Sequence, residues 1–287
     1  MKIVVTGSKG RLGSVVVEYA RAQGAEVLGV DTIGIGNFVD YINADVTDLG
    51  QVYDVLHGAD AVVHLAAIRD PRLYPAAKTF LNNVSSSYNV HLAAAHLGIK
   101  RVVSASSIQL THVVTPRTPL DFKYFPFDEA HPLSPHDDYT LSKQVGEDIA
   151  DSFAHHWGLT AVSLRYTGVI VREAWDRLPR KTSSSPRRMP WPYPHYVHVE
   201  DAARCTYLAA TASLPAGSHT VAFVTAQDTA IDMPSEAWIA AYFPNAERRA
   251  AFKGYEALVS GQVAQQTLGF VAQHSWRTAG ATQNTSP

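Results

Sequence analysis

Three side chains of types that move protons occur in a pattern typical of a catalytic unit. Tyr139 and Lys143 lie four residues apart in "YTLSK", within an apolar-periodic run that predicts a helix, so both share one helix face. A phenol with a pKa of about 10 is a poor base at neutral pH, but a nearby ammonium group favours its phenolate form. We therefore predict that Tyr139 exchanges a proton with a substrate hydroxyl or carbonyl while Lys143 tunes the phenol. The segment "ASS" supplies Ser107, with Ser106 beside it, as a hydrogen-bond donor to the substrate oxygen.

Tyrosine–lysine pairs occur by chance on many helices, so the pair alone is weak evidence of catalysis. A glycine-rich loop near the start of the chain strengthens that evidence. The stretch "VTGSKGRLGS" places Gly7, Gly10 and Gly13 between a predicted strand and a predicted helix. Glycine lets the chain turn tightly, lets a pyrophosphate approach the backbone and lets the helix pack closely on the strand. The loop therefore predicts a dinucleotide site, where hydride moves to or from a nicotinamide while Lys143 also holds the ribose.

The acid at the end of the second predicted strand bears on the choice of dinucleotide. Asp31 lies at about the offset at which a carboxylate binds the adenosine ribose diol, and its charge repels a 2′-phosphate. Because "TIGIG" after it offers no arginine, we predict NAD rather than NADP as cofactor. Lys9 and Arg11 are within reach of a phosphate, but we interpret both as solvated or bound to the pyrophosphate. Arg11 and its neighbour Leu12 are included among the predicted cofactor contacts.

The elements that must position these residues alternate between strands and helices. Short β-branched runs predict strands at 2–7, 25–31, 59–67, 101–107 and 160–166, and amphipathic runs predict helices around 12–23, 48–57, 76–97 and 138–157. This order predicts an α/β fold with a doubly wound parallel sheet of the Rossmann type.

The alternation breaks after residue 170, where a proline- and arginine-rich loop begins. Beyond the loop we predict a strand at 194–199, a helix from Glu200 to about Ala212 and a strand at 219–226, and then only short helical patterns. We predict an NAD-binding domain at 1–170, completed by 196–226, and a small C-terminal substrate-binding lobe formed by 171–195 and 227–287.

The composition excludes several classes of protein. The 287-residue chain has a formal net charge of −2, which gives no global reason to expect nucleic acid or a membrane surface as partner. No stretch approaches the roughly 18 consecutive apolar residues of a membrane-spanning helix. The single cysteine, Cys205, cannot form an internal disulfide, and the apolar start runs straight into the glycine loop instead of forming a secretory leader. We therefore expect a cytoplasmic protein.

Taken together, the motifs resemble those of the extended short-chain dehydrogenase/reductase family (NAD-dependent epimerase/dehydratase family), which contains sugar epimerases, dehydratases and uronate dehydrogenases. In the family's order, the chain carries "TGSKGRLG", "ADVTD", "HLAA", "NNV", "RVVSASS", "YTLSK", "LRYTGV" and "YVHVEDAA". The resemblance implies that Asp45 and Val46 lie against the adenine, that Leu65, Ala66 and Ala67 line the path of the cofactor, and that Asn83 braces the nearby helix. It also implies a homodimer that pairs the helices at 76–97 and 138–157.

Two departures from the family's pattern bear on the reaction. Dehydratases of the family carry an Asp-Glu pair soon after the active-site serine or threonine, whereas Ser107 is followed by Ile108, Gln109 and Leu110. This difference disfavours dehydration. Gly168 stands where many nucleotide-sugar enzymes of the family carry an asparagine, which favours a smaller substrate.

A basic cluster between 172 and 188 has two interpretations. It contains Arg172, Arg177, Arg180, Lys181, Arg187 and Arg188. The cluster either recognises a carboxylate or phosphate of the substrate, with Arg172 and Arg188 as the contacts, or is a mobile, solvated loop. Arg69 and Gln109 are further candidates for substrate contact, although Arg69 fits an exposed structural role equally well.

The histidines do not predict a metal site. His195 and His198 are three apart in a predicted strand, where their side chains point to opposite faces, and we identify no carboxylate or cysteine that completes a site with them. The pair at 155–156 is likewise unsupported.

The leading hypothesis is an NAD-dependent oxidoreductase that acts at a secondary alcohol or ketone of a sugar or sugar acid, a carbohydrate-like and possibly anionic substrate. The first alternative is a nucleotide-sugar epimerase that uses Ser107, Tyr139 and Lys143 but returns the hydride to the other face. The second is a non-catalytic protein that binds NAD as a sensor, against which the intact triad argues.

Overall fold

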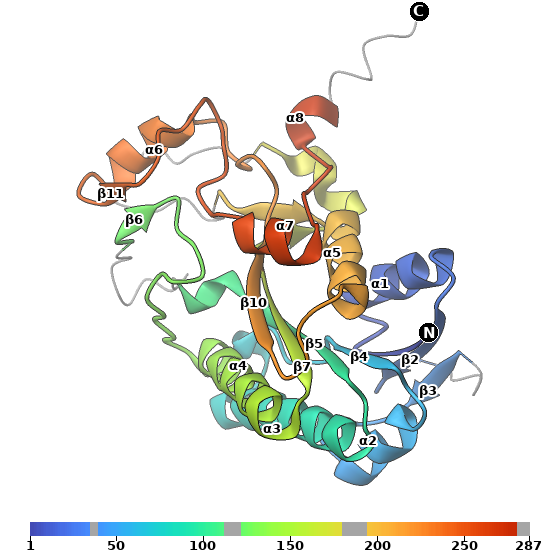
Figure 1. The fold of residues 1–287 in the computed structure, drawn as a ribbon. Helices are drawn as coiled ribbons and strands as arrows, with labels where there is room; N and C mark the ends of the chain where they lie inside the picture. The colour runs from blue at the N-terminus through green and yellow to red at the C-terminus, as the bar shows by residue number, and fades with distance from the viewer. Residues whose placement is uncertain (35–39, 112–121, 180–193, 280–287) are drawn as a thin grey trace, which may run out of the picture.

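A parallel sheet lies at the centre of the computed structural model, which describes residues 1–34, 40–111, 122–179 and 194–279 (Figure 1). Within those ranges the sheet has seven strands in the order β10-β7-β5-β4-β1-β2-β3, and each neighbouring pair is parallel. The strands are β1 (Lys2–Thr6), β2 (Glu26–Asp31), β3 (Tyr41–Asn43), β4 (Ala61–His64), β5 (Arg101–Ser107), β7 (Thr160–Tyr166) and β10 (His219–Val224). The chain starts in the middle of the sheet, winds to one edge and then to the other, which confirms the doubly wound α/β fold.

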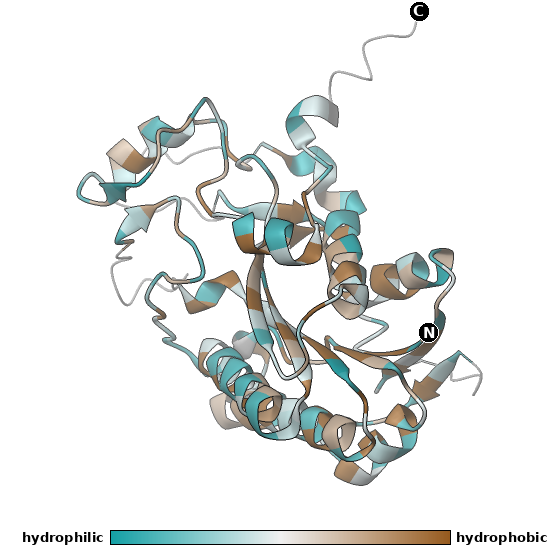
Figure 2. Cartoon of the chain, in the orientation of Figure 1, coloured by the Kyte–Doolittle hydropathy of each residue, from teal (hydrophilic) through white to brown (hydrophobic). Residues whose placement is uncertain are grey.

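Helices cover both faces of the sheet. One face packs on α1 (Arg11–Ala22), α5 (Val199–Thr211) and α7 (Gln262–Leu268), and the other on α2 (Leu49–Leu56), α3 (Ala76–His96) and α4 (Asp138–Trp157). Successive strand residues point to opposite faces, so Val5 joins the first apolar cluster and its neighbour Val4 the second. Burial on both faces explains why the central strands are hydrophobic along most of their length, as Figure 2 shows.

A separate aromatic cluster joins a middle segment of the chain to the tail. Phe122, Phe125 and Phe127 pack with Ile231 and Trp238. The segment contributes β6 (Tyr124–Phe125), which pairs with β11 (Glu247–Arg248), and the tail contributes α6 (Ser235–Tyr242). Residues 122–127, which the sequence analysis assigns to the first domain, therefore pack with residues of the predicted lobe. The predicted division into an NAD-binding domain and a substrate-binding lobe stays a prediction.

Several short elements complete the described part of the chain. They are the 3-10 helices η1 (Pro71–Leu73), η2 (Ile108–Leu110) and η3 (Arg172–Arg177), the strands β8 (Gly168–Ile170) and β9 (Tyr196–His198), and the helix α8 (Trp276–Ala279). The strand predicted at 194–199 pairs with β8 and not with the main sheet. Among the described helices, none has the length and apolar character needed to cross a membrane.

Candidate active site

The first two turns of α4 position Tyr139 and Lys143. Asp137 caps the helix, because its carboxylate accepts a hydrogen bond from the Thr140 amide at 2.7 Å while the Thr140 hydroxyl accepts one from the Asp137 amide at 3.1 Å. Tyr139 thus lies in the first turn, and Lys143 lies one turn further along the same face. Lys143 Nζ donates a hydrogen bond to the Ala105 carbonyl at 2.8 Å and lies 5.7 Å from the centre of the Tyr139 ring. The structure therefore brings the predicted pair together at the carboxyl end of β5.

Ser107 completes the predicted triad from the last position of β5. It is buried, its hydroxyl accepts a hydrogen bond from the Gln109 amide at 3.1 Å, and it is close enough to Tyr139 to lower the pKa of the phenol. Ser106, the neighbouring candidate, points the other way, as alternation along a strand requires, and donates to Glu147 Oε1 at 2.6 Å. The geometry thus selects Ser107 as the serine that faces the phenol.

Burial and charge act in opposite directions on the phenol and the ammonium. Burial raises the pKa of Tyr139 above its ordinary value, while the nearby Ser107 hydroxyl and the positive charge of Arg69 lower it. Burial lowers the pKa of Lys143 to about 8, and the carboxylate of Glu147 opposes that change. Arg69 is thus a second cation near the phenol, besides Lys143, whose predicted role stays a prediction.

A buried ion pair beneath Lys143 was not predicted from the sequence. Arg165 and Glu147 are both buried and form two hydrogen bonds, Nε to Oε1 at 2.9 Å and Nη2 to Oε2 at 2.7 Å. Glu147 lies four residues after Lys143, so the same helical spacing that links Tyr139 to Lys143 extends to it. The spacing could have identified Glu147 from the sequence. It could not have identified Arg165, the partner of Glu147, because Arg165 lies in β7.

A small polar cavity lies against Lys143. Its volume is about 20 Å³, and its lining includes Lys143, Glu147, Ser104 and Ser163. The Ser104 hydroxyl finds no hydrogen-bond partner within the described residues. A space of this size holds one water molecule, which needs polar partners of the kind that line it.

The glycine loop forms a cradle that no larger residue would fit. Gly7 has a positive φ of 68°, and a Cβ there would lie 2.7 Å from the Ala66 amide nitrogen. A Cβ on Gly13 would lie 2.1 Å from the Gly7 carbonyl oxygen. These contacts let α1 start against the ends of β1 and β4 with its first amides exposed to an anion, which fits the pyrophosphate of a dinucleotide.

Asp31 lies beside this cradle with each carboxylate oxygen bound to a backbone amide. Oδ2 accepts from Lys9 at 2.9 Å and Oδ1 accepts from Thr32 at 2.8 Å, so both oxygens keep lone pairs for a ribose diol. The Lys9 ammonium lies 3.5 Å from the centre of the Tyr41 ring, and it is thus packed on an aromatic face instead of being only solvated. Arg11 is exposed at the first position of α1, and Leu12 packs partly into the apolar core.

The remaining predicted cofactor contacts lie at the ends of β3 and β4. The carboxylate of Asp45 accepts hydrogen bonds from the amide and the hydroxyl of Thr47, and Val46 is buried. Leu65, Ala66 and Ala67 follow β4 and are half-buried. Their contacts with the cofactor remain predictions.

Asn83 joins the segment after β4 to α4. Its amide exchanges two hydrogen bonds with the backbone of Ile68, at 2.8 and 2.9 Å, and donates to Ser142 Oγ at 3.1 Å. Asn89, which sequence reasoning missed, holds the loop after β3 by donating to the carbonyls of Val46 and Thr47. Both asparagines act from α3, so this helix fixes two loops at the edge of the cofactor site.

The predicted substrate contacts have different positions. Arg69 is exposed and close enough to Tyr139 to act on its pKa, and Gln109 follows Ser107 in η2. Arg172 is bound to Glu200, with Nε 2.7 Å from Oε1, so a substrate contact would require it to leave that ion pair. Arg188 lies outside the described residues, as do Arg180, Lys181 and Arg187 of the basic cluster.

A larger cavity lies away from this triad, at the end of β10 beside α7. It has a volume of about 500 Å³ and is lined by Thr225, Gln227, Ser260, Gly261, Gln262, Gln265, Gln266, Phe270, Val271 and Ala272. None of the predicted catalytic or cofactor-binding residues lines it. Proximity to Ser107, Tyr139 and Lys143 therefore defines the candidate site better than cavity size.

Curated relatives match somewhat more than half of the chain. A uronate dehydrogenase from Pseudomonas putida is 29% identical over 173 residues, which are 57% of this chain and 59% of the relative. An L-arabinose 1-dehydrogenase (NAD(P)(+)) from Haloferax volcanii is 31% identical over 187 residues, which are 61% of this chain and 71% of the relative. The match to the uronate dehydrogenase thus spans less than two thirds of that protein's length.

Solved structures share the fold over nearly the whole chain. A short-chain dehydrogenase/reductase superfamily protein from Agrobacterium tumefaciens with bound NAD has a TM-score of 0.74 at 24% identity and covers 99% of this chain and 98% of its own. MoeE5 in complex with UDP-glucuronic acid and NAD has a TM-score of 0.73 at 22% identity, with coverages of 98% and 97%.

A family model places the chain more specifically. The model described as "NAD dependent epimerase/dehydratase family" matches residues 3–188, which include the glycine loop, Asp31, Ser107, Tyr139 and Lys143. The glycine cradle and the free lone pairs of Asp31 fit the dinucleotide that this family uses. The chain therefore belongs to the NAD-dependent epimerase/dehydratase family, and NAD is its cofactor.

Proposed function

We propose that this protein is an NAD-dependent oxidoreductase that transfers hydride at a secondary alcohol or ketone of a sugar or sugar acid. The observation that carries the proposal is the placement of Tyr139 and Lys143 on one face of α4, with Lys143 bound to the Ala105 carbonyl and Ser107 at the end of the same strand. The relatives named uronate dehydrogenase and L-arabinose 1-dehydrogenase support a sugar or sugar acid as substrate.

In the oxidative direction, the chain's own residues handle the proton and the orientation of the substrate. NAD supplies the hydride acceptor. Tyr139 removes the proton from the substrate hydroxyl as the C–H bond breaks, and Ser107 donates a hydrogen bond to the same oxygen. Lys143 Nζ is bound to the Ala105 carbonyl and lies 5.7 Å from the centre of the Tyr139 ring. From this position it orients the ribose and keeps a positive charge near the phenol. The charge of Arg69 beside Tyr139 favours a substrate with a carboxylate.

The alternative is an epimerase, because a putative UDP-glucose 4-epimerase from Methanocaldococcus jannaschii is also 28% identical over 177 residues. A third possibility is a protein that binds NAD without catalysis. A single experiment separates the three: purified protein is mixed with NAD and a panel of aldoses, uronates and sugar nucleotides. A dehydrogenase accumulates NADH, an epimerase interconverts sugars without net NADH, and a sensor binds NAD but does neither.

The preference for NAD over NADP tests the role of Asp31. We expect NAD to bind more tightly than NADP. Asp31→Asn should reduce the difference in affinity between the two cofactors, because it removes the charge that repels a 2′-phosphate. Asp60, an exposed acid whose carboxylate also accepts a backbone amide bond, provides the matched control Asp60→Asn. Tighter binding of NADP to the wild type would contradict this role and point to Lys9 and Arg11.

A homodimer in the cytoplasm is part of the same proposal. Leu81 and Tyr88 on α3 and Leu141 and Trp157 on α4 are exposed apolar side chains on the two helices that the family pairs between subunits. Light scattering on the purified protein tests it: a mass of one chain at micromolar concentration contradicts the dimer.

A further inference from the structure

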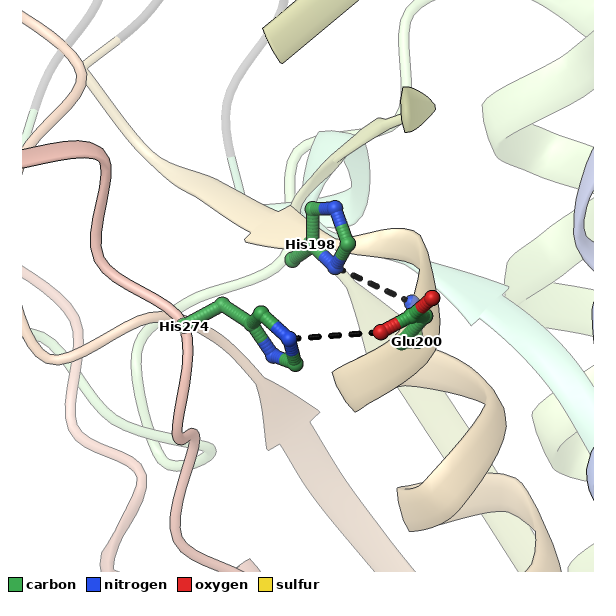
Figure 3. A group of neighbouring side chains, drawn as sticks. All are labelled: His198, Glu200 and His274. Atoms are coloured by element: carbon green, nitrogen blue, oxygen red, sulfur yellow. Dashed lines mark hydrogen bonds and ion pairs between the residues drawn. The ribbon is translucent and has the colours of Figure 1, made fainter. Parts of the chain in front are cut away.

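Three side chains with metal-binding atoms meet at the start of α5 (Figure 3). His198 ends β9, Glu200 lies in the first turn of α5, and His274 comes from the segment before α8. One possible ligand atom from each of the three lies within 4.8 Å of the others. The structure adds to His198 and Glu200 a second histidine from the far end of the chain, which spacing in the sequence does not reveal.

The orientation of His274 is fixed by a buried carboxylate. Its Nδ1 lies 3.1 Å from Asp201 Oδ2, and the same oxygen accepts hydrogen bonds from the amides of Gln273 and His274 at 2.9 and 2.8 Å. Asp201 is 1% exposed. This arrangement places the proton of a neutral imidazole on Nδ1 and leaves a lone pair on Nε2. Histidines that bind metals usually donate their other N–H to a carboxylate in this way.

The free nitrogen of His274 faces a carboxylate oxygen. Nε2 lies 3.3 Å from Glu200 Oε2, so two lone pairs meet unless a positive centre lies between them. The positive charge of Arg172 does not serve this purpose, because its guanidinium binds the other oxygen, Oε1. The contact therefore needs either a second proton on His274 or a bound cation.

The position of His198 favours the cation. Its ring stacks on that of His274, with centroids 4.3 Å apart, and its Nδ1 faces the Glu200 amide at 3.4 Å, which is longer than an ordinary hydrogen bond. A proton on His274 would join only two of the three groups, whereas a metal ion uses a lone pair from each. Glu200 and His274 are half-exposed, so small rotations of these side chains bring the ligand atoms to bonding distance.

We propose that His198, Glu200 and His274 bind one divalent first-row transition-metal ion, with Zn²⁺ the best fit. Two imidazoles and one carboxylate match the nitrogen and oxygen ligands that Zn²⁺ accepts, with water as the fourth ligand. Ca²⁺ and Mg²⁺ fit less well because they prefer oxygen ligands throughout. The ion joins the start of α5 to the segment before α8 and so holds the C-terminal part of the chain on the sheet. This proposal is independent of the proposed reaction.

The test titrates Zn²⁺ into tag-free, chelator-treated full-length protein against a chromophoric competitor. We expect one tight site per chain in the wild type and an affinity lower by about tenfold or more in His274→Gln and Glu200→Gln. His155→Gln is the matched control, because His155 is also a histidine beside a carboxylate, with Nδ1 3.4 Å from Asp151, but among the described residues it belongs to no group of three ligand atoms that all lie within 4.8 Å of one another. It should leave the affinity unchanged.

Two measurements on the wild type keep the proposal testable if a variant does not fold. Zn²⁺ should raise the melting temperature, because it binds the folded state, and Co²⁺ should give the visible absorption of a four-coordinate site. The absence of a tight site, or equal affinity in the wild type and a folded His274→Gln, would overturn the proposal.

Discussion

The Tyr139–Lys143 pair and the cluster of His198, Glu200 and His274 are assembled in opposite ways. The pair comes from two turns of one helix, so a spacing of four residues in the sequence is enough to place both side chains. The cluster depends on a tertiary contact between the start of α5 and the segment before α8. Local spacing therefore identifies the first site and cannot identify the second.

The two regions also differ in what controls their charges. At the first site burial dominates, since it raises the pKa of Tyr139 and lowers that of Lys143. At the second, carboxylates and arginines alternate: Arg172 binds Glu200, and Arg204 binds Asp201. We therefore predict that changes at the first site alter proton transfer, whereas changes at the second alter the binding of a cation and the stability that the cation adds.

The largest expected effect follows from Tyr139→Phe, which removes the proton-transferring hydroxyl and keeps the ring. We expect turnover to fall by about 10²- to 10⁴-fold, the usual contribution of general acid–base catalysis. Affinity for NAD should change little, and binding of Zn²⁺ should not change. Steady-state rates of NADH formation with the substrate identified from the panel measure the effect, and intact turnover would contradict the role of Tyr139.

A smaller loss is expected from Ser107→Ala. The substitution removes one donor to the substrate oxygen and a hydroxyl that lowers the pKa of Tyr139, so turnover should fall by about 10²- to 10³-fold. Ser107→Thr keeps the hydroxyl and should retain most of the rate. If alanine and threonine reduced the rate equally, the loss would reflect packing at the end of β5 and not the hydroxyl.

The buried ammonium of Lys143 predicts a pH-dependent stability. Its folded pKa of about 8 lies below the ordinary value of 10.5, so below pH 8 both states carry the proton and the cost of burying the charge is fully present. Between pH 8 and 10.5 the unfolded state binds more protons, and stability rises with pH by at most about 1.4 kcal/mol per unit. Urea unfolding measures this effect as the difference between the free energies of unfolding of the wild type and Lys143→Met. Between pH 8 and 10.5 the wild type should gain stability relative to the variant, and a constant difference would contradict the prediction.

Most of the sheet and the proximity of Ser107, Tyr139 and Lys143 could be predicted because their signals are local. The five predicted strands of the first part of the chain became β1, β2, β4, β5 and β7, since each is a short β-branched run buried on both faces. The glycine loop could also be predicted from its spacing. The structure gives the physical reason for glycine at positions 7 and 13, because a side chain there would collide with the backbone. Short strands such as β3 and β8 carry too few residues to show a period.

What could not be predicted depends on contacts between distant segments. The aromatic residues at 122–127 read as part of the first domain, but they pack with Trp238 and Leu258. The orientation of Arg172 toward Glu200 likewise follows from the fold around η3 and α5, which no sequence period encodes. The charge of Arg69 near Tyr139 belongs to the same class, since it comes from the segment after β4.

The smallest expected effect is the most demanding test of the contrast between the two regions. His274→Gln removes a proposed metal ligand but no group of the catalytic triad, so turnover per folded molecule should stay within about twofold of the wild type while Zn²⁺ affinity falls. His274 is tied to α5, and α5 packs on the sheet face opposite to α4. Any influence on Tyr139 would therefore have to pass through the strands. A large loss of turnover with NAD binding intact would show that the C-terminal segment positions the substrate, and the two regions would then form one functional unit.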